Sequence, residues 1–141
     1  PGVIKAGSRN GDIVSPVDFA GNFCEIAGFD APSDLHGRSL APILKGKTPK
    51  DWRKSFYYHY YEYPGYHWVR RHYGVADGRY KLIRFYEKDE WELYDLKEDP
   101  KELKSVYDQP EYAKIQGRMR RELDRLRKEY EVPTSVYQAL K

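Results

Sequence analysis

The segment from His67 to Tyr86 contains the residue types that recognise anionic groups. It reads HWVRRHYGVADGRYKLIRFY and holds two histidines, four arginines, one lysine and five aromatic residues. Guanidinium and imidazolium groups bind carboxylates and sulfates through charge-assisted hydrogen bonds. We therefore predict that one or more of His67, Arg71 and His72 contact a ligand near the start of this segment. The alternative is an exposed loop whose charges pair across neighbouring strands.

The distribution of charge supports a local anionic partner. The 141 residues carry a net charge of +3. Residues 51–86 contribute +4 (seven Lys/Arg, three Asp/Glu), and residues 87–141 contribute −2 (twelve and fourteen). A basic sheet with aromatic residues could also stack single-stranded nucleic acid. The excess is small, no RNP-type motif is present, and the aromatic residues continue into the acidic WELYDLKEDP, so we predict no nucleic-acid partner.

Motifs for catalysis and metal binding are absent from the sequence. It contains no HExxH, paired CxxC, EF-hand, GxxxxGK[ST] or GxSxG pattern. Cys24, the one cysteine, lies in an apolar stretch, and we expect an inert thiol. We therefore predict no catalytic residue and no metal site within the chain. No apolar run approaches the roughly 20 residues that span a bilayer, so we expect no membrane partner.

The first third of the sequence predicts one short helix followed by a long connection. The helix is expected over residues 16–27, with Ser15 as N-cap, Pro16 at the first helical position and Gly28 in the left-handed conformation after its end. Frequent proline and glycine then indicate a long connection over residues 29–50, in which Ser39 to Leu44 could form one helical turn.

From Ser55 the pattern favours antiparallel strands and a terminal helix. Four strands are expected over about residues 55–96, with a type I′ turn at Asp77-Gly78. A long helix is expected over about 110–130, opened by a capping box of Asp108 and Glu111. Its apolar residues recur at intervals of three and four, which predicts a single buried stripe: Tyr112, Ile115, Met119, Leu123, Leu126 and Tyr130.

Five segments, in order along the chain, resemble the C-terminal portion of the type I sulfatases of the alkaline-phosphatase-like superfamily. They are PGVIKAG, IVSPVDFAGNFCEIAGFDAP, LHGRSLAPILKGK, RYKLIRFY and WELYDLKEDPKELKSVY. Each motif alone is weak, but their order is specific.

The resemblance implies an α+β fold: about four antiparallel strands packed with a long C-terminal helix, preceded by a remnant of a large α/β sulfatase domain. Residues 1–46 would be the end of that large domain, and residues 47–141 the C-terminal sub-domain. The missing N-terminal sulfatase domain would then be a partner. Without it, the face formed by Phe19, Phe23 and Ile26 is expected to be exposed, so the isolated chain should dimerise or aggregate.

The resemblance also implies a function and a location. Sulfatases of this family hydrolyse sulfate esters with a formylglycine and a calcium ion, both expected in the missing N-terminal part. Cys24 lacks the [CS]-x-P-x-R context, so the chain alone is predicted to be inactive. In glycan-directed sulfatases the C-terminal sub-domain borders the substrate pocket, which gives His67, Arg71 and His72 the role of contacts to a sulfated glycan. The family suggests a periplasmic or extracellular location.

This chain departs from the family pattern at two places, Ala76-Asp77 and Lys104-Ser105. The second hypothesis is a non-catalytic carbohydrate- or protein-binding domain built from the same sheet and helix.

Overall fold

The computed structural model describes residues 3–133 and divides the chain into two compact units, Pro1–Lys54 and Ser55–Lys141. The division lies after Lys54, further along the chain than the boundary expected after Gly46. That residues 1–46 complete a larger domain stays a prediction.

The first unit contains two short helices, α1 (Asp18–Ala27) and α2 (Ala41–Leu44). As predicted, α1 ends at Gly28, which has a φ of 75° and donates its backbone N–H to the carbonyls of the last turn. The expected start is wrong, because α1 begins at Asp18 and no side chain caps it. The Ser15 backbone N–H instead donates to the Asp18 carboxylate at 2.8 Å. Cys24 is half-buried in α1.

Asp18 is the buried polar centre of the first unit. Its side chain is 0% exposed and accepts hydrogen bonds from the backbone N–H of Ser15 and of Arg38 at 2.8 and 2.9 Å. The Arg53 guanidinium binds the same carboxylate at 2.6 and 2.5 Å. Burial by itself would raise the pKa of Asp18, but the hydrogen bonds from Arg53 and the backbone hold this pKa below its ordinary value.

The second unit is a four-stranded antiparallel sheet, as predicted, and its strand order is β1-β2-β3-β4. The strands are β1 (Phe56–Tyr60), β2 (His72–Ala76), β3 (Tyr80–Phe85) and β4 (Glu90–Asp95). Tyr73 pairs with Arg84 and Arg84 with Trp91, so these three residues form one row across the sheet.

The β2–β3 turn differs from the predicted one. Asp77 donates its backbone N–H to the Tyr80 carbonyl at 3.1 Å, so Gly78 and Arg79 are the central residues. Only Gly78 has a positive φ, 86°, which matches a type II′ turn with glycine first rather than type I′. The Asp77 carboxylate accepts the Tyr80 backbone N–H at 2.7 Å and thereby holds the turn closed.

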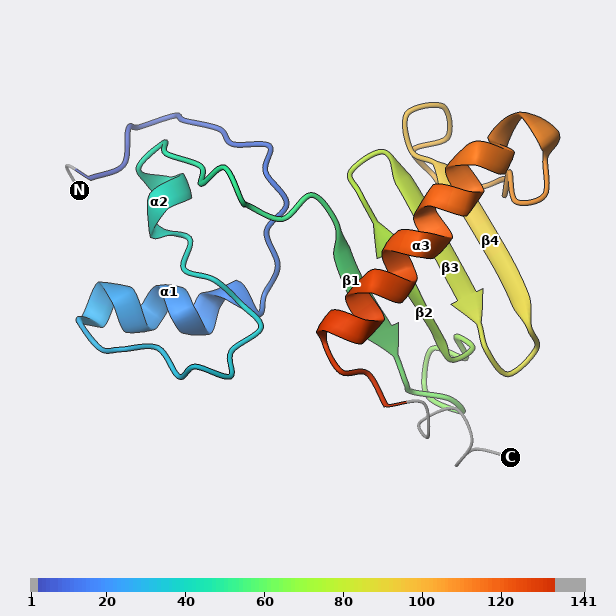
Figure 1. Cartoon of the computed structure of the whole chain (residues 1–141), viewed down its shortest axis with the longest axis horizontal. Helices are drawn as coiled ribbons and strands as arrows, with labels where there is room; N and C mark the ends of the chain where they lie inside the picture. The colour runs from blue at the N-terminus through green and yellow to red at the C-terminus, as the bar shows by residue number, and fades with distance from the viewer. Residues whose placement is uncertain (1–2, 134–141) are drawn as a thin grey trace. The chain divides into compact units, whose positions relative to one another are not determined.

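A 3₁₀ turn, η1 (Pro110–Tyr112), leads into the terminal helix α3 (Ala113–Glu129), which lies across one face of the sheet (Figure 1). The predicted stripe is confirmed, because alternate strand residues and the helix form one core: Tyr73, Val75, Leu82, Leu93, Met119, Leu123 and Leu126. The capping box is wrong. Within the described residues no side chain caps η1 or α3, and Asp108 Oδ1 instead accepts from the Gln116 side chain at 3.3 Å.

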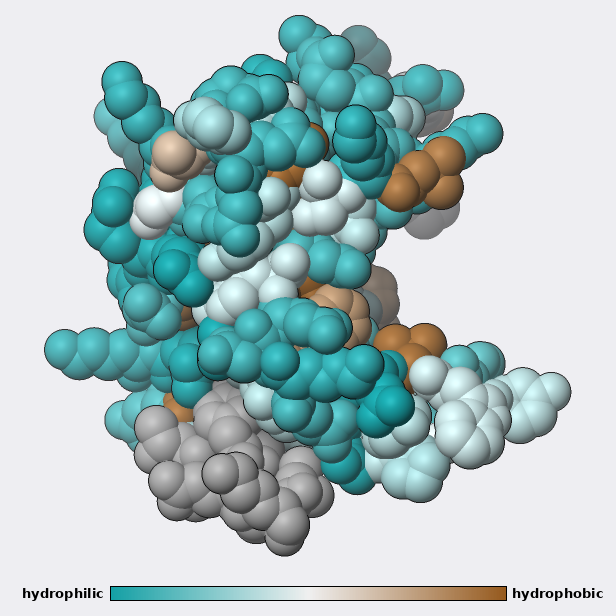
Figure 2. All heavy atoms as spheres, turned by 90° about the vertical axis from the view of Figure 1, so that its right-hand side faces the viewer, coloured by the Kyte–Doolittle hydropathy of each residue, from teal (hydrophilic) through white to brown (hydrophobic). Residues whose placement is uncertain are grey.

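Hydrophilic residues predominate on the side of the molecule shown in Figure 2, where apolar residues are scattered. Among the described residues, no helix has both the length and the apolar character needed to cross a membrane.

Candidate functional site

The loop between β1 and β2, residues 61–71, presents aromatic rings to solvent at one end of the sheet. Tyr66 is 89% exposed and Trp68 is 73% exposed. Trp68 has a φ of 52°, a backbone conformation that few non-glycine residues adopt. Exposed aromatic faces with nearby donors can stack on the apolar side of a sugar ring while polar groups bind its hydroxyls.

Arg71 is the residue that holds this loop in place. Its Nε donates to the Tyr61 carbonyl at 2.8 Å, and a second nitrogen, Nη2, donates to the Tyr63 carbonyl. Its Nη1 forms an ion pair with Glu87 at 2.7 Å, in the turn between β3 and β4. One planar guanidinium therefore ties two backbone positions of the loop to a neighbouring turn, which a flexible ammonium could not do.

The other two predicted residues lie in different surroundings. His67 is exposed, and its ring meets that of Tyr66 edge-on at 5.3 Å. His72 begins β2, where its ring stacks on Tyr60 at 5.4 Å and its Nδ1–H donates to the Arg70 carbonyl at 2.7 Å. Within the described residues, no hydrogen bond or ion pair joins any two of His67, Arg71 and His72. Direct substrate contact by these three residues stays a prediction.

Arg70 is a cation of the loop that the sequence did not single out. Its guanidinium lies over the Tyr63 ring at 4.4 Å, and that ring meets Trp68 edge-on at 6.2 Å. The aromatic content of YPGYHWVRRHYG was the available signal for Tyr66, Trp68 and Arg70, but one sequence does not reveal which rings face solvent.

A histidine under the loop remains neutral at physiological pH. The His59 ring stacks on Tyr61 at 3.8 Å and lies 3.1 Å, by its Nδ1, from the Tyr57 hydroxyl. Burial, with the nearby charges of His72 and Arg127, lowers the pKa of His59 to about 4. The neutral His59 ring therefore serves as a stacking surface beneath the exposed Tyr61 ring.

The described residues do not fit a metal ion. No group of three His, Cys, Asp or Glu side chains among residues 3–133 is placed to hold one. Two buried carboxylates are already paired, Asp18 with Arg53 and Asp95 with Arg79. No chemical step through calcium can be assigned to this part of the chain.

Comparison with known proteins gives this arrangement a family context. Residues 1–129 match the family model "N-sulphoglucosamine sulphohydrolase, C-terminal". An N-acetylglucosamine-6-O-sulfatase of Bacteroides thetaiotaomicron is 50% identical over 92% of the chain, and a Δ4,5-hexuronate-2-O-sulfatase of the same organism is 36% identical over 77%. The chain spans 24% and 22% of the lengths of these relatives.

Solved structures show the same fold. A protein in complex with its substrate D-glucosamine-2-N,6-O-disulfate matches with a TM-score of 0.90 and 47% identity, over 95% of this chain and 28% of that one. A 2-O glycosaminoglycan sulfatase matches with a TM-score of 0.70 and 31% identity, over 85% of this chain and 25% of that one.

Proposed function

We infer that this chain, which belongs to the N-sulphoglucosamine sulphohydrolase C-terminal family, is the C-terminal part of a sulfatase that acts on sulfated glycans. The observation that carries the proposal is the family match over residues 1–129, which includes the whole sheet, the exposed loop and all of α3. In this proposal the chain completes the fold and helps to select the substrate. The nucleophile, as a formylglycine, and a calcium ion belong to the N-terminal part.

The loop 61–71 is the proposed edge of the substrate pocket. His67, Tyr66 and Trp68 are exposed and would contact the sugar, His67 by hydrogen bonding and the two rings by stacking. Arg71 and His72 are engaged within the protein and would act by positioning the loop. Recognition by a preorganised edge avoids the entropy cost of ordering a loop at each binding event.

The 50% identity to an N-acetylglucosamine-6-O-sulfatase makes a 6-O-sulfated glucosamine the substrate to test first. We expect the protein that contains this chain together with its N-terminal domain to release sulfate from N-acetylglucosamine 6-sulfate, measured by ion chromatography. A 2-O-sulfated hexuronate disaccharide is the specificity control. The 141-residue chain alone should release none. Absence of sulfate release from every sulfated sugar would overturn the proposal and favour a non-catalytic carbohydrate-binding role.

The apolar face of α1 is the proposed contact with the N-terminal domain. Phe19 and Phe23 stack at 6.1 Å, and Phe23 and Ile26 are 64% and 69% exposed. A contiguous exposed apolar face of this kind marks an interaction surface. In the isolated chain the same face is expected to drive self-association.

We expect simultaneous replacement of Phe19, Phe23 and Ile26 by serine to shift the isolated chain to a monomer in light scattering. Leu103→Ser, which removes an exposed apolar side chain of the second unit, is the control and should leave the mass unchanged. A wild-type chain that is monomeric at high concentration and binds no apolar dye would contradict this role of the face.

A further inference from the structure

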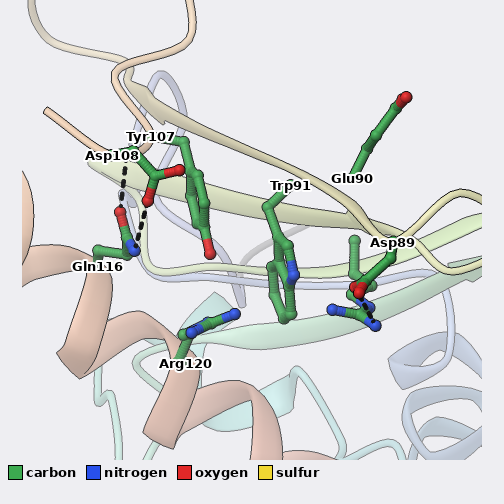
Figure 3. Close-up of a pocket in the computed structure, with 8 residues that line it drawn as sticks. Asp89, Glu90, Trp91, Tyr107, Asp108, Gln116 and Arg120 are labelled. Carbon is green, nitrogen blue, oxygen red and sulfur yellow. Dashed lines mark hydrogen bonds and ion pairs between the residues drawn. The ribbon is translucent and has the colours of Figure 1, made fainter.

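The second unit has a polar groove at the edge of the sheet, near the start of α3 (Figure 3). Its volume is about 610 Å³. The walls come from β3, the β3–β4 turn, β4, the segment before η1, and the first turns of α3. The predicted ligand residues of the loop do not line this groove.

Aromatic rings and guanidinium groups form the base of the groove. Trp91 and Tyr107 stack nearly parallel, with ring centres 6.0 Å apart and an angle of 5° between their planes. The guanidinium of Arg84 lies 4.6 Å from the centre of the Trp91 ring, and that of Arg120 lies 4.4 Å from it. Both guanidinium groups lie within cation–π distance of the indole ring, and a guanidinium held in this way keeps N–H groups that can bind an anion.

Three carboxylates border the groove: one forms an ion pair, one accepts a hydrogen bond from a neighbouring side chain, and one points away from the groove. Asp89 forms an ion pair with Arg84 at 2.5 Å. The Asp108 carboxylate accepts one hydrogen bond, from the Gln116 side chain at 3.3 Å, and the Asp108 backbone N–H donates to Gln116 Oε1 at 2.9 Å. Glu90 points away from the groove in Figure 3.

Arg120 is the cation of the groove that lacks a counter-charge. Among the described residues its guanidinium makes contacts only with the Trp91 and Tyr107 rings, and it has no ion pair or hydrogen bond. The Tyr107 hydroxyl likewise has no hydrogen-bond partner in this part of the chain, and burial raises the pKa of Tyr107, so the hydroxyl remains protonated and able to donate. Figure 3 shows the Tyr107 hydroxyl and the Arg120 guanidinium at the same side of the groove.

We propose that this groove binds a sulfate or carboxylate group of an acidic sugar, with Arg120 as the principal cation and the Tyr107 hydroxyl as a second donor. Trp91 orients Arg120 and excludes water from one of its faces. The choice of ligand rests on the proposed function: if the loop 61–71 binds one sugar of a sulfated glycan, a neighbouring acidic sugar of that glycan is the anion available to the groove.

The register of the sheet places the groove near the loop. Trp91 lies in the same row as Tyr73, the second residue after the loop, and two strand spacings separate them, about 10 Å. The β3–β4 turn joins the two places, since Glu87 binds Arg71 of the loop and Asp89 binds Arg84 of the groove. The loop and the groove would therefore hold different sugars of one short oligosaccharide.

The test is a calorimetric titration of the 141-residue chain, kept monomeric by the serine replacements of Phe19, Phe23 and Ile26, with a heparin-derived tetrasaccharide and with its fully desulfated, N-acetylated counterpart. We expect Arg120→Gln to weaken binding of the sulfated tetrasaccharide by about tenfold or more, because the loss of a hydrogen bond from a charged group has an effect of at least that size. Tyr107→Phe should weaken it to a smaller extent. Arg121→Gln is the matched control: it removes the same charge from the next, exposed position of α3, outside the groove, and should change the affinity less than twofold.

Equal losses in Arg120→Gln and Arg121→Gln would indicate non-specific attraction to a basic helix and would overturn the site. Wild-type affinity in Arg120→Gln would overturn it as well. Circular dichroism must show the same thermal midpoint for both variants. Failure of the proposed function has a different signature: sulfate release is absent in the protein with its N-terminal domain, while the Arg120-dependent binding persists.

Discussion

Replacement of Asp18 by alanine is expected to unfold the first unit. The Asp18 carboxylate binds the Arg53 guanidinium and accepts hydrogen bonds from two backbone N–H groups, and the change removes all of these contacts. The Arg53 side chain, which is only 13% exposed, then has no counter-charge. Loss of one partner of a buried ion pair costs about 3–5 kcal/mol. We expect hydrogen exchange of backbone amides in residues 13–54 to become fast, while the amides of β2 and β3 keep their protection.

A matched control for this prediction lies in the same unit. Asp51 forms an ion pair with Arg38 at 3.1 Å, but its side chain is 77% exposed. An exposed pair contributes about 0–1 kcal/mol, so Asp51→Ala should leave the exchange pattern nearly unchanged. Equal effects of Asp18→Ala and Asp51→Ala would show that the buried network does not stabilise the unit.

The pH dependence follows from the lowered pKa of Asp18. A carboxylate whose pKa is lower in the folded state contributes stability that is fully present above its unfolded pKa of about 3.9 and disappears as the pH falls through the folded value. The difference in stability between the wild type and Asp18→Asn should therefore be constant from pH 7 to about pH 5 and decrease below about pH 4.

Replacement of Arg71 by alanine is expected to lower kcat/KM of the proposed full-length sulfatase by about 100-fold, since displacement of a substrate-positioning group by about 1 Å can have an effect of that size. The change removes two hydrogen bonds to loop carbonyls and the ion pair with Glu87. Because the loop is proposed to bind the sugar rather than to carry out the chemistry, most of the effect should appear as a higher KM.

Three further measurements separate positioning from general stability. Arg71→Lys should restore little activity, because one ammonium cannot reach three acceptors in a plane. Glu87→Gln should raise KM in the same direction but less, since the bonds to the loop carbonyls remain. Arg118→Ala, which breaks a partly exposed pair with Asp77 at the other end of the sheet, should leave KM unchanged. A normal KM in Arg71→Ala would exclude a role for the loop in substrate binding.

Local errors in the predicted fold share one physical origin. Ser15 and Asp108 were expected to cap helices, because short polar side chains before an apolar stretch favour that role. In the structure Asp18 turns toward Arg53, and Asp108 binds Gln116. The Asp77-Gly78 dipeptide was expected to supply both central residues of its turn. Instead Asp77 precedes the central pair Gly78-Arg79, and its carboxylate accepts hydrogen bonds from the backbone N–H groups of Arg79 and Tyr80. In each case a polar side chain has several local partners of similar energy, and its surroundings select one.

The sequence predicted where the basic, aromatic loop lies but not which of its side chains face solvent. A basic, aromatic stretch before a hairpin was enough to locate the loop. Exposure then separates Trp68 and His67, which face solvent, from Arg71 and His72, which are bound within the protein. The groove at Trp91 brings together Arg84, Tyr107 and Arg120 from three elements, and no spacing in the sequence relates them.

The sequence by itself determined the four antiparallel strands, the terminal helix and the sulfatase family, because apolar periodicity and ordered motifs are properties of contiguous residues. The tertiary structure alone decided which charges are neutralised. Arg71 forms an ion pair with Glu87, and Arg53 forms one with Asp18. Among the described residues, Arg120 contacts only aromatic rings. Pairing of charges depends on distances of a few ångströms between residues far apart in the chain, and only the packed fold sets those distances.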